Sequence, residues 1–356
     1  TGAPAAPVLV SASDDVPGIT GVMASGGASN DTKPTLVFTA EAGSTVKVYD
    51  GATLLGTASE GPSGTFTFTP AAPLADGSHS FTARATDVVG NESAPSSAFA
   101  ITLDTVAPSA PAVLIPEATD GVNASELASG GGTPVTITLP ANASVGDTVT
   151  TVVTTPYGTT LTLSTVLQAS DLPPAQGGTA AGSGPFTINQ LIPSAALIID
   201  GAWTTSTTIS DTVGNASSST AGAFTLDTTG PIAPALVSAT DDVGPLTGAL
   251  ASGASTNDTK PALVFTAEPG STLKIYDGST LLGTATEGPA GTYTFVPSNP
   301  LSEGAHSLTA TATDAAGNTS PSSSPLALTV DTTAPAAPAL VSVTDDLAPQ
   351  TGALSS

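Results

Sequence analysis

Carboxylates are the side chains of this sequence whose number and spacing could do chemistry. Asp and Glu number 29 against 5 Lys and Arg, with 2 His and no Cys. An Asp precedes each of three Pro-rich segments, at Asp104, Asp227 and Asp331, and the pattern Asp-x-x-Gly-Asn also occurs three times. Oxygen ligands in flexible loops suit Ca²⁺, whereas Mg²⁺ prefers fewer protein ligands and keeps more waters. The acidic residues therefore predict calcium binding, provided that the fold brings them together.

The composition excludes several other classes of function. Nucleic acid and anionic membrane surfaces require a Lys/Arg stripe, which 5 basic residues in a chain of formal net charge −24 cannot form. The absence of Cys excludes a disulfide framework and thiolate metal sites. No segment approaches the length of about 18 apolar residues that spans a membrane. We therefore expect neither nucleic acid binding nor direct membrane insertion.

Internal repeats define the organisation of the chain. Residues 4–111 and 231–338 match without a gap at a constant shift of 227, as from Asp14 to Asp241. A longer, divergent unit lies between these near-copies, and the Pro-rich segments mark the boundaries. The expected domains are 1–104, 105–227 and 228–331, followed by the start of a fourth unit at 332–356. The chain thus reads as a piece of a longer protein that continues in both directions.

Short strands separated by turn residues are expected in every unit. With 39% apolar residues and a mean hydropathy of +0.24, the chain can bury a core. In the first unit the expected strands lie near 8–13, 34–40, 45–50, 53–58, 64–69, 79–87 and 98–103. The longer unit adds possible single helical turns near 123–128 and 193–199 and an expanded loop near 170–185. About seven antiparallel strands per unit predict an all-β fold of tandem immunoglobulin-like β-sandwiches in an extended, monomeric rod, without the Cys pair of antibody domains.

Two histidines occupy a position that the longer unit fills with tryptophan. Asp76-Gly-Ser-His79 aligns with Glu303-Gly-Ala-His306 and with Asp200-Gly-Ala-Trp203. We interpret a position that accepts either His or Trp as a packing position. Neither a metal-binding nor a catalytic role is therefore expected for the histidines.

Strand parity places the acidic motifs at the ends of the units. If the units join end to end, the loop entering the last strand lies at the N-terminal end and faces the preceding linker. The A–B loop, which joins the first expected strand of a unit to the second, lies at the opposite end, close to the outgoing linker. Each junction would then gather three or more acidic or amide side chains. The candidate ligands are Asp104, Asp227 and Asp331 in the linkers; Asp87, Asn91, Asp211, Asn215, Asp314 and Asn318 in the Asp-x-x-Gly-Asn loops; Asp31 and Asp258 in the A–B loops; Glu117 and Asp120 in the longer unit; and the pairs Asp14, Asp15 and Asp241, Asp242.

The same motifs are also good turn sequences, in which Asp or Asn caps a turn without any metal. We favour calcium because three kinds of motif converge on the junctions. The Asp-Asp pairs lie a strand length from the junction, about 3.3 Å per residue, and form either a second site or a solvated turn.

Catalysis is not expected. The sequence has no Gly-x-Ser-x-Gly, His-Glu-x-x-His or phosphate-binding loop, and its acids repeat in every unit. Thr on alternate strand positions leaves an ice-binding or carbohydrate-binding face as an alternative, although aromatic residues make up only 4% of the chain. The divergent unit is the best place to look for such a binding module, and spacer domains of a secreted enzyme would look the same.

Taken as a set, the motifs resemble the bacterial Ig-like extender repeats of giant RTX-type adhesins. The resemblance rests on Asp331-Thr-Thr-Ala-Pro-Ala-Ala-Pro, Asp241-Asp242-Val-Gly-Pro-Leu-Thr-Gly, Asn257-Asp258-Thr-Lys-Pro, Tyr276-Asp277-Gly, Leu301-Ser-Glu-Gly-Ala-His306-Ser-Leu-Thr and Thr313-Asp314-Ala-Ala-Gly-Asn318. The middle unit, with Glu117-Ala-Thr-Asp120-Gly and Gly146-Asp147-Thr, resembles a longer variant found in the same proteins.

The resemblance implies a calcium-stiffened stalk, exported by type I secretion to the surface of a Gram-negative cell. Such a stalk projects a ligand-binding tip in biofilm formation or host attachment, and its partners are the adjacent repeats of the same chain. Lys33 and Lys260 stand where the family often has Thr, which puts the A–B loop ligand in question. Thr1 lacks the preceding Asp, so the site beside Asp87 and Asn91 is expected to be incomplete.

Overall fold

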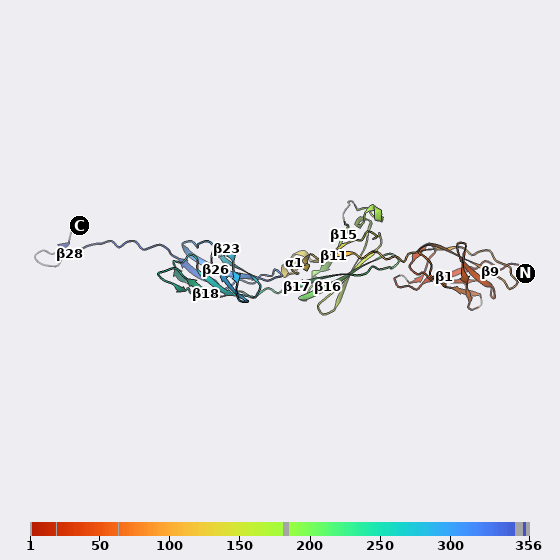
Figure 1. The fold of residues 1–356 in the computed structure, drawn as a ribbon, viewed down its shortest axis with the longest axis horizontal. Helices are drawn as coiled ribbons and strands as arrows, with labels where there is room; N and C mark the ends of the chain where they lie inside the picture. Colours follow the sequence, from red (N-terminus) through yellow and green to blue (C-terminus); the bar gives the residue numbers. More distant parts are fainter. Residues whose placement is uncertain (1, 19, 63, 181–184, 346–351, 354–356) are drawn as a thin grey trace. The chain divides into compact units, whose positions relative to one another are not determined.

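The computed structural model describes residues 2–18, 20–62, 64–180, 185–345 and 352–353. It forms two compact units, Thr1–Asp227 and Thr228–Ser356. Regular structure in the described residues is nearly all β-strand, and the strands form sandwiches (Figure 1). None of the helices in these ranges is long and apolar enough to cross a membrane. The all-β, immunoglobulin-like prediction is confirmed.

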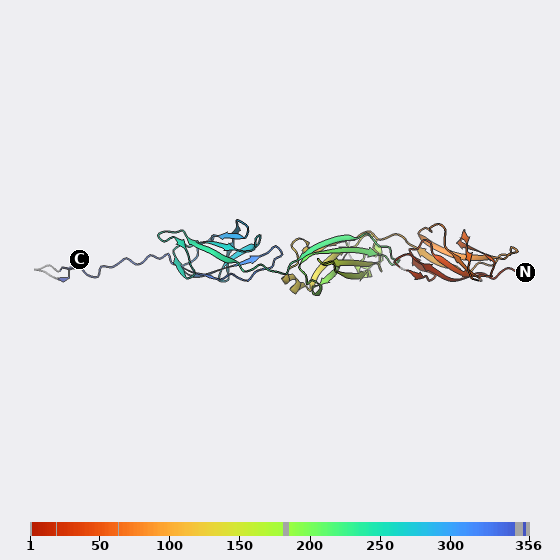
Figure 2. The same ribbon diagram turned by 90° about the horizontal axis from the view of Figure 1, so that it is seen from below.

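The first unit begins with a sandwich of two five-stranded sheets, whose red to orange strands are seen from below in Figure 2. One sheet has the order β2 (Gly21–Val22), β1 (Val8–Asp14), β4 (Thr35–Thr39), β8 (Thr65–Phe68), β7 (Ser59–Glu60). The other has the order β3 (Gly27–Ser29), β10 (Phe99–Leu103), β9 (Gly77–Thr86), β5 (Thr45–Asp50), β6 (Thr53–Thr57).

Alternation of apolar and polar residues builds the core of this sandwich. In β8 the two Phe residues are buried while Thr67 between them is exposed, and β10 buries every second residue. Phe38, Phe66 and Phe81 are each 1% exposed and are among the largest side chains of the core. The period of two in the sequence therefore sets which face of each sheet points inward.

Three short strands and one parallel pairing were not expected. Besides the predicted strands, the chain forms β2, β3 and β7, and β3 runs parallel to β10 with Ser29 opposite Leu103. The chain crosses between the sheets after β2, so β3 runs beside the last strand in the same direction. Next to this pairing, the backbone N–H of Asp104 donates a hydrogen bond to the carbonyl oxygen of Ser29 at 3.0 Å. The A–B loop therefore lies beside the outgoing linker, as strand parity predicted.

The second sandwich of the first unit is built from longer strands. One sheet has the order β11 (Ala112–Leu114), β12 (Gly132–Thr138), β15 (Thr187–Pro193), and the other β14 (Thr160–Val166), β13 (Thr148–Thr154), β16 (Gly201–Ser210), β17 (Thr220–Leu226). Trp203 is 1% exposed and stacks on Phe224 in its core. The expected helical turns are present as α1 (Ala124–Gly130) and η4 (Ser194–Ala196). Two further 3₁₀ turns, η2 (Ala169–Asp171) and η3 (Pro174–Gln176), lie in the predicted loop; η1 (Pro116–Ala118) precedes α1.

The second unit repeats the first sandwich almost strand for strand. One sheet has the order β19 (Gly248–Ala249), β18 (Ala235–Asp241), β21 (Ala262–Thr266), β25 (Thr292–Phe295), β24 (Thr286–Glu287). The other has the order β20 (Ala254–Thr256), β27 (Leu326–Val330), β26 (Gly304–Thr313), β22 (Thr272–Asp277), β23 (Thr280–Thr284). After this sandwich, β28 (Thr344–Asp345) pairs with β29 (Gly352–Ala353).

Candidate functional site

A buried carboxylate pair lies where β1 ends and the A–B loop follows β3. Asp14 and Asp31 are 4% and 2% exposed. Ser29 connects them, because its Oγ donates to Asp14 Oδ2 at 2.6 Å and accepts from the backbone N–H of Asp31 at 3.0 Å. Asp31 Oδ1 accepts from the N–H of Lys33 at 2.7 Å, whereas the buried Asp31 Oδ2 has no hydrogen-bond partner. A buried carboxylate oxygen without a donor is unfavourable unless another group neutralises it.

The second unit contains the same arrangement with one substitution. Thr256 replaces Ser29, yet its Oγ1 still donates to Asp241 Oδ2 at 2.6 Å and accepts from the N–H of Asp258 at 3.0 Å. Asp258 is 2% exposed, and its Oδ2 again lacks a partner. The hydroxyl is therefore retained although the residue type differs, and the orphaned oxygen occurs in both outer repeats.

The surroundings of Asp31 disfavour its negative charge. Burial raises the pKa of the Asp31 carboxyl, the backbone N–H of Lys33 lowers it, and the charges of Asp14 and Asp15 raise it again. The N–H of Asp15 also favours the charged form, without making a hydrogen bond to Oδ2. The net effect is a raised pKa. A cation at this place would offset both burial and repulsion.

Lys33 does not supply that cation. Its ammonium donates to the carbonyl of Ala71 at 3.1 Å, and the ammonium of Lys260 donates likewise to Ser298 at 2.7 Å. Both side chains anchor a neighbouring loop, while their backbone N–H groups hold Asp31 and Asp258. The lysines thus leave the A–B carboxylates available.

The Asp-x-x-Gly-Asn loops are closed turns. Asp87 Oδ1 accepts from the N–H groups of Val89 and Asn91 at 3.0 and 2.8 Å, and Asn91 Nδ2 donates to Asp87 Oδ2 at 2.7 Å. These contacts hold the pKa of Asp87 low, first through the Asn91 side chain. Asp211 with Asn215, and Asp314 with Asn318, form the same turn. The turn interpretation therefore describes these motifs well, and a metal role for them stays a prediction.

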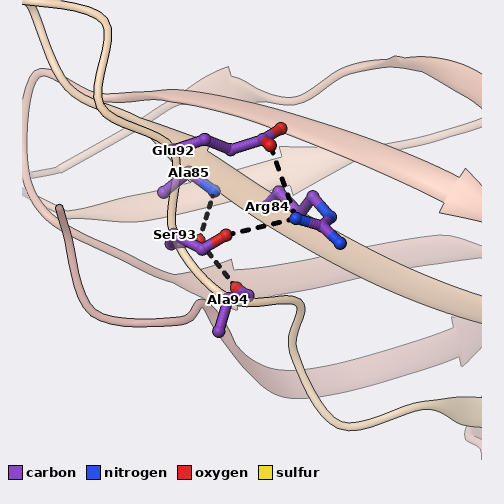
Figure 3. A network of polar contacts seen from close by, with 5 residues as sticks. All are labelled: Arg84, Ala85, Glu92, Ser93 and Ala94. Atoms are coloured by element: carbon purple, nitrogen blue, oxygen red, sulfur yellow. Dashed lines mark hydrogen bonds and ion pairs between the residues drawn. The ribbon is translucent and has the colours of Figure 1, made fainter.

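A serine after each of these loops fixes its position on the sandwich. Figure 3 shows the network in the first repeat, where the N–H of Ala85 donates to Ser93 Oγ and Ser93 Oγ donates to the carbonyl of Ala94, at 3.0 and 2.7 Å. Arg84 reaches Glu92 Oε2 and the Ser93 carbonyl, both at 3.4 Å (Figure 3). Ser217 and Ser320 repeat the role of Ser93. These hydrogen bonds tie the end of each loop to the preceding strand.

The first unit brings an Asp-x-x-Gly-Asn loop against the preceding linker. Asn215 Nδ2 donates to the backbone carbonyl of Asp104 at 2.8 Å. Asp147, which is 2% exposed, lies close by: burial raises the pKa of its carboxyl, the N–H of Ser144 lowers it, and the charges of Asp211 and Asp104 raise it. Sequence reasoning missed Asp147 as a site residue because the outer repeats have Ser44 and Ser271, not an acid, directly before the corresponding strands.

A glycine contact brings the two sandwiches of the first unit together. A Cβ on Gly18 would lie 2.8 Å from the Cα of Gly214, in the loop between Asp211 and Asn215. Gly18 has φ of +126°, whereas Gly21 has a similar φ of +120° with open space around it. Only a residue without a side chain allows this approach.

Gly18→Ala is expected to loosen the junction after the first sandwich, and Gly21→Ala is not. Both substitutions introduce backbone strain of about 1 kcal/mol, but only Gly18→Ala forces the two loops apart. Hydrogen exchange of the peptides containing Asp104 and Asn215 measures the effect. Equal exchange in the two variants would show that the glycine contact does not hold the junction.

The remaining candidate ligands have mixed placements. Asp104 Oδ1 and Asp331 Oδ1 cap their own linkers through the N–H groups of Val106 and Thr333, at 2.9 and 3.0 Å. In the middle repeat, Glu117 Oε2 is buried without a partner, whereas the Asp120 side chain is exposed. Glu117 borders a cavity of about 380 Å³ with Glu126 and Thr133. The predicted approach of Asp314 and Asn318 to Asp227 concerns residues of different units and stays a prediction. Thr1, and Asp346 in the fourth unit, lie outside the described residues.

In the described ranges, no three His, Cys, Asp or Glu side chains are already arranged to hold a metal ion. A cation at Asp31 would therefore draw on amide, carbonyl or water oxygens besides the carboxylates. Asn30 offers one such group, because its Oδ1 is buried without a hydrogen-bond partner in a residue that is 8% exposed. The chemistry of this donor set, all oxygen, fits Ca²⁺.

Two segments of the chain, residues 6–105 and 234–332, match the family model of the bacterial Ig-like domain, and together they make up more than half of the sequence. The chain belongs to this family. The two matches coincide with the outer sandwiches, and the middle sandwich, with its longer strands, lies between them. Comparison with curated protein sequences found no match.

Several solved structures are similar to this bacterial Ig-like chain. A 1.5-MDa bacterial ice-binding adhesin, described for its host cell surface retention, is 19% identical over 85% of this chain and 92% of that chain, with a TM-score of 0.34. The BSP domain of a biofilm-associated protein is 15% identical over 94% of this chain and 67% of that chain, with a TM-score of 0.20. Domains FN1–FN3 of chicken CNTN1 are 10% identical over 92% of this chain and 99% of that chain, with a TM-score of 0.31.

Proposed function

We propose that this chain is a non-catalytic extender region of a bacterial surface adhesin, in which calcium stabilises the repeats and stiffens their junctions. The parent protein would be a giant RTX-type adhesin, exported by type I secretion from a Gram-negative cell. Its stalk would project a ligand-binding tip for biofilm formation or host attachment. Tandem bacterial Ig-like repeats and a formal net charge of −24 support this proposal.

One observation carries the calcium part of the proposal. The outer repeats each bury a carboxylate, Asp31 or Asp258, whose Oδ2 has no partner. Each lies beside an Asp-Asp pair at the end of the first strand, Asp14, Asp15 or Asp241, Asp242. Asp14 and Asp241 are held by the hydroxyl of Ser29 or Thr256, which leaves the acids in fixed positions. The two near-copies differ in the hydroxyl residue yet keep the orphaned oxygen, which supports a purpose for it.

When bound, Ca²⁺ would supply positive charge to carboxylates that otherwise repel one another. Asp31, Asp14 and Asp15 would hold it in the first repeat, and Asp258, Asp241 and Asp242 in the third. In the middle repeat, Glu117 is the corresponding candidate because its Oε2 is also buried without a partner. At the first junction, Asp104, Asp147 and Asp211 concentrate negative charge around the linker.

The mechanical consequence follows from the connection between loop and linker. The carbonyl of Ser29 accepts from Asp104 N–H at 3.0 Å, and the carbonyl of Thr256 accepts from Asp331 N–H at 2.9 Å. Fixing the A–B loop with a cation therefore fixes the start of each outgoing linker. The Pro residues of the linkers already favour extended backbone. A ligand that binds only the folded state also stabilises that state by mass action.

Calcium titration of the full chain tests the proposal. We expect heat of binding in calorimetry, a higher melting temperature in Ca²⁺ than in chelator, and a narrower distribution of dimensions in small-angle scattering. Stabilisation of about 2.7 kcal/mol is expected at a free Ca²⁺ concentration a hundredfold above the dissociation constant. Mg²⁺ at equal concentration is the control, and it should have a smaller effect. Identical melting and scattering in Ca²⁺ and chelator would contradict the proposal.

A further inference from the structure

Each outer repeat contains a histidine whose two ring nitrogens both face oxygen acceptors. His79 Nδ1 lies 2.7 Å from Asp50 Oδ2, and His79 Nε2 lies 2.7 Å from the carbonyl oxygen of Ala75. A carbonyl has no proton to give, an ionised carboxylate has none, and a neutral imidazole has a single N–H. Both contacts are hydrogen bonds only when the ring carries two protons. The geometry is therefore that of an imidazolium paired with a carboxylate.

The third repeat reproduces this geometry. His306 Nδ1 lies 2.7 Å from Asp277 Oδ2, and His306 Nε2 lies 2.8 Å from the carbonyl oxygen of Ser302. The second oxygen of each aspartate accepts from the next backbone N–H of the strand, from Ser80 at 2.8 Å and from Ser307 at 2.9 Å. Both aspartates are thus oriented by the sheet toward the ring.

The middle repeat shows the same position without a titrating group. Trp203 Nε1 donates to the carbonyl of Ile199 at 2.9 Å, which corresponds to the bond from His79 Nε2. On the neighbouring strand, Asp50 lies opposite Phe81, two residues after His79, and Val153 lies opposite Thr205, two residues after Trp203. The carboxylate is therefore absent where the ring cannot take a second proton. The His and the Asp act as a pair.

The loop held by the histidine also holds the outgoing linker. Asp76 follows Ala75, and its carboxylate accepts from the N–H and the hydroxyl of Thr105 at 3.0 and 2.9 Å. Glu303 follows Ser302 and binds Thr332 in the same way. We name residues 75–76 and 302–303, together with these contacts, the linker clasp.

We propose that His79 with Asp50, and His306 with Asp277, are proton-dependent locks on the linker clasp. Protonated, each ring ties the strand that carries the Asp to the loop that grips the linker. Loss of one ring proton removes one of the two bonds, so the clasp of the outer repeats loosens, while the Trp203 position does not respond. This device is independent of calcium and of the adhesin function proposed above.

The surroundings of the ring support the protonated form. Burial lowers the pKa of His79, but the hydrogen bonds to Asp50 and Ala75 and the charge of Asp50 raise it more, so the net pKa is raised. The same causes act on His306. Phe81, on the same strand, stacks on the His79 ring at a centroid distance of 6.0 Å, and Ile101 on β10 lies opposite His79. Asp76 is turned to Thr105, and Lys47 and Arg84 lie opposite each other further along the sheet.

The sign of the effect follows from the raised pKa. A histidine with a folded-state pKa above its unfolded value contributes stability that is complete below about pH 6.5 and is lost as the pH rises through the folded-state pKa. The linker clasp is therefore expected to be tight in mildly acidic solution and looser in alkaline solution. A clasp held by a side chain that does not titrate would show no such dependence on pH.

NMR titration of the full chain in chelator tests the proposal, because only 2 His contribute ring signals. Both histidines are expected to titrate above about 6.5. In Asp50→Asn, the pKa of His79 should fall by about one unit or more, while His306 keeps its value as a control within the same molecule. Values at or below the free-histidine pKa, or an unchanged His79 in Asp50→Asn, would overturn the proposal.

Hydrogen exchange then tests the connection to the linker. After correction for intrinsic rates, amides of residues 75–77 and 105 should lose protection between about pH 6 and about pH 9, and those of residues 199–201 should not. Asp50→Asn should remove the pH dependence at residues 75–77 and keep it at residues 302–304. Equal pH dependence in all three loops would show that the histidines do not control the clasp.

Discussion

Asp31→Asn is expected to change the stability of the first repeat in opposite directions with and without calcium. In chelator the substitution removes a charge that is buried among like charges, so stability should rise at neutral pH. The raised pKa of Asp31 gives the sign: burial, followed by the charges of Asp14 and Asp15, disfavours the ionised carboxyl in the folded state. In Ca²⁺ the substitution removes a ligand, and the mass-action stabilisation of about 2.7 kcal/mol at a hundredfold excess should largely disappear.

Thermal unfolding of the full chain, together with hydrogen exchange of the peptides that contain β1 and β4, measures this reversal. In Ca²⁺, Asp258→Asn should remove the corresponding ligand and destabilise β18 and β21, since its Oδ2 is also buried without a partner. Glu41→Gln, an equal charge change on an exposed residue, is the matched control and should change stability by at most about 0.5 kcal/mol in either condition. A shift of the same sign with and without calcium would refute a cation at Asp31.

Trp203→Ala is expected to destabilise the middle sandwich by about 3–5 kcal/mol. The Trp203 side chain is 1% exposed, stacks on Phe224 at a centroid distance of 6.0 Å, and donates to the Ile199 carbonyl at 2.9 Å. Alanine would leave a large cavity and a carbonyl without its donor. Because folded domains are only marginally stable, a loss of this size unfolds a large fraction of molecules on moderate heating.

Calorimetry of the full chain measures this loss as an early transition. Tyr157→Ala is the matched control, because it removes an aromatic ring of the same sandwich that is 80% exposed. It should change stability by at most about 0.5 kcal/mol. Comparable losses in the two variants would mean that Trp203 does not organise the core.

Most of the fold could be predicted from local patterns. Alternating residues such as those of β8 and β10 reveal strands because a two-sided sheet needs one apolar face. The strands β3 and β20 were missed, since each has three residues and depends on parallel pairing with the last strand of its sandwich. A strand this short has no pattern of its own and exists only because a distant strand offers its edge.

The candidate site could be predicted in part. The recurrence of acids singled out the candidate ligands, whose metal role stays a prediction. Strand parity predicted that Asn215 would meet the linker of Asp104, which their hydrogen bond confirms. The sequence did not separate the carboxylates satisfied by turn amides, such as Asp87, from the one left with an orphaned oxygen, Asp31. That distinction depends on burial and on the direction of each N–H group.

The histidines show the same limit. Alignment with Trp203 correctly indicated a packing position, yet the carboxylate beside each ring comes from a strand about 29 residues away. No local pattern connects His79 with Asp50, because the contact arises from the register of β5 on β9.

The sequence by itself determined the repeat boundaries that we expect, the all-β class and the supply of carboxylate oxygens, because periodicity, turn residues and composition are local properties. Only the tertiary structure decided which oxygens lack a donor and which rings face a carboxylate. Those properties arise from strand register and burial, which bring residues that are far apart in the chain into a medium where an unpaired charge is unfavourable.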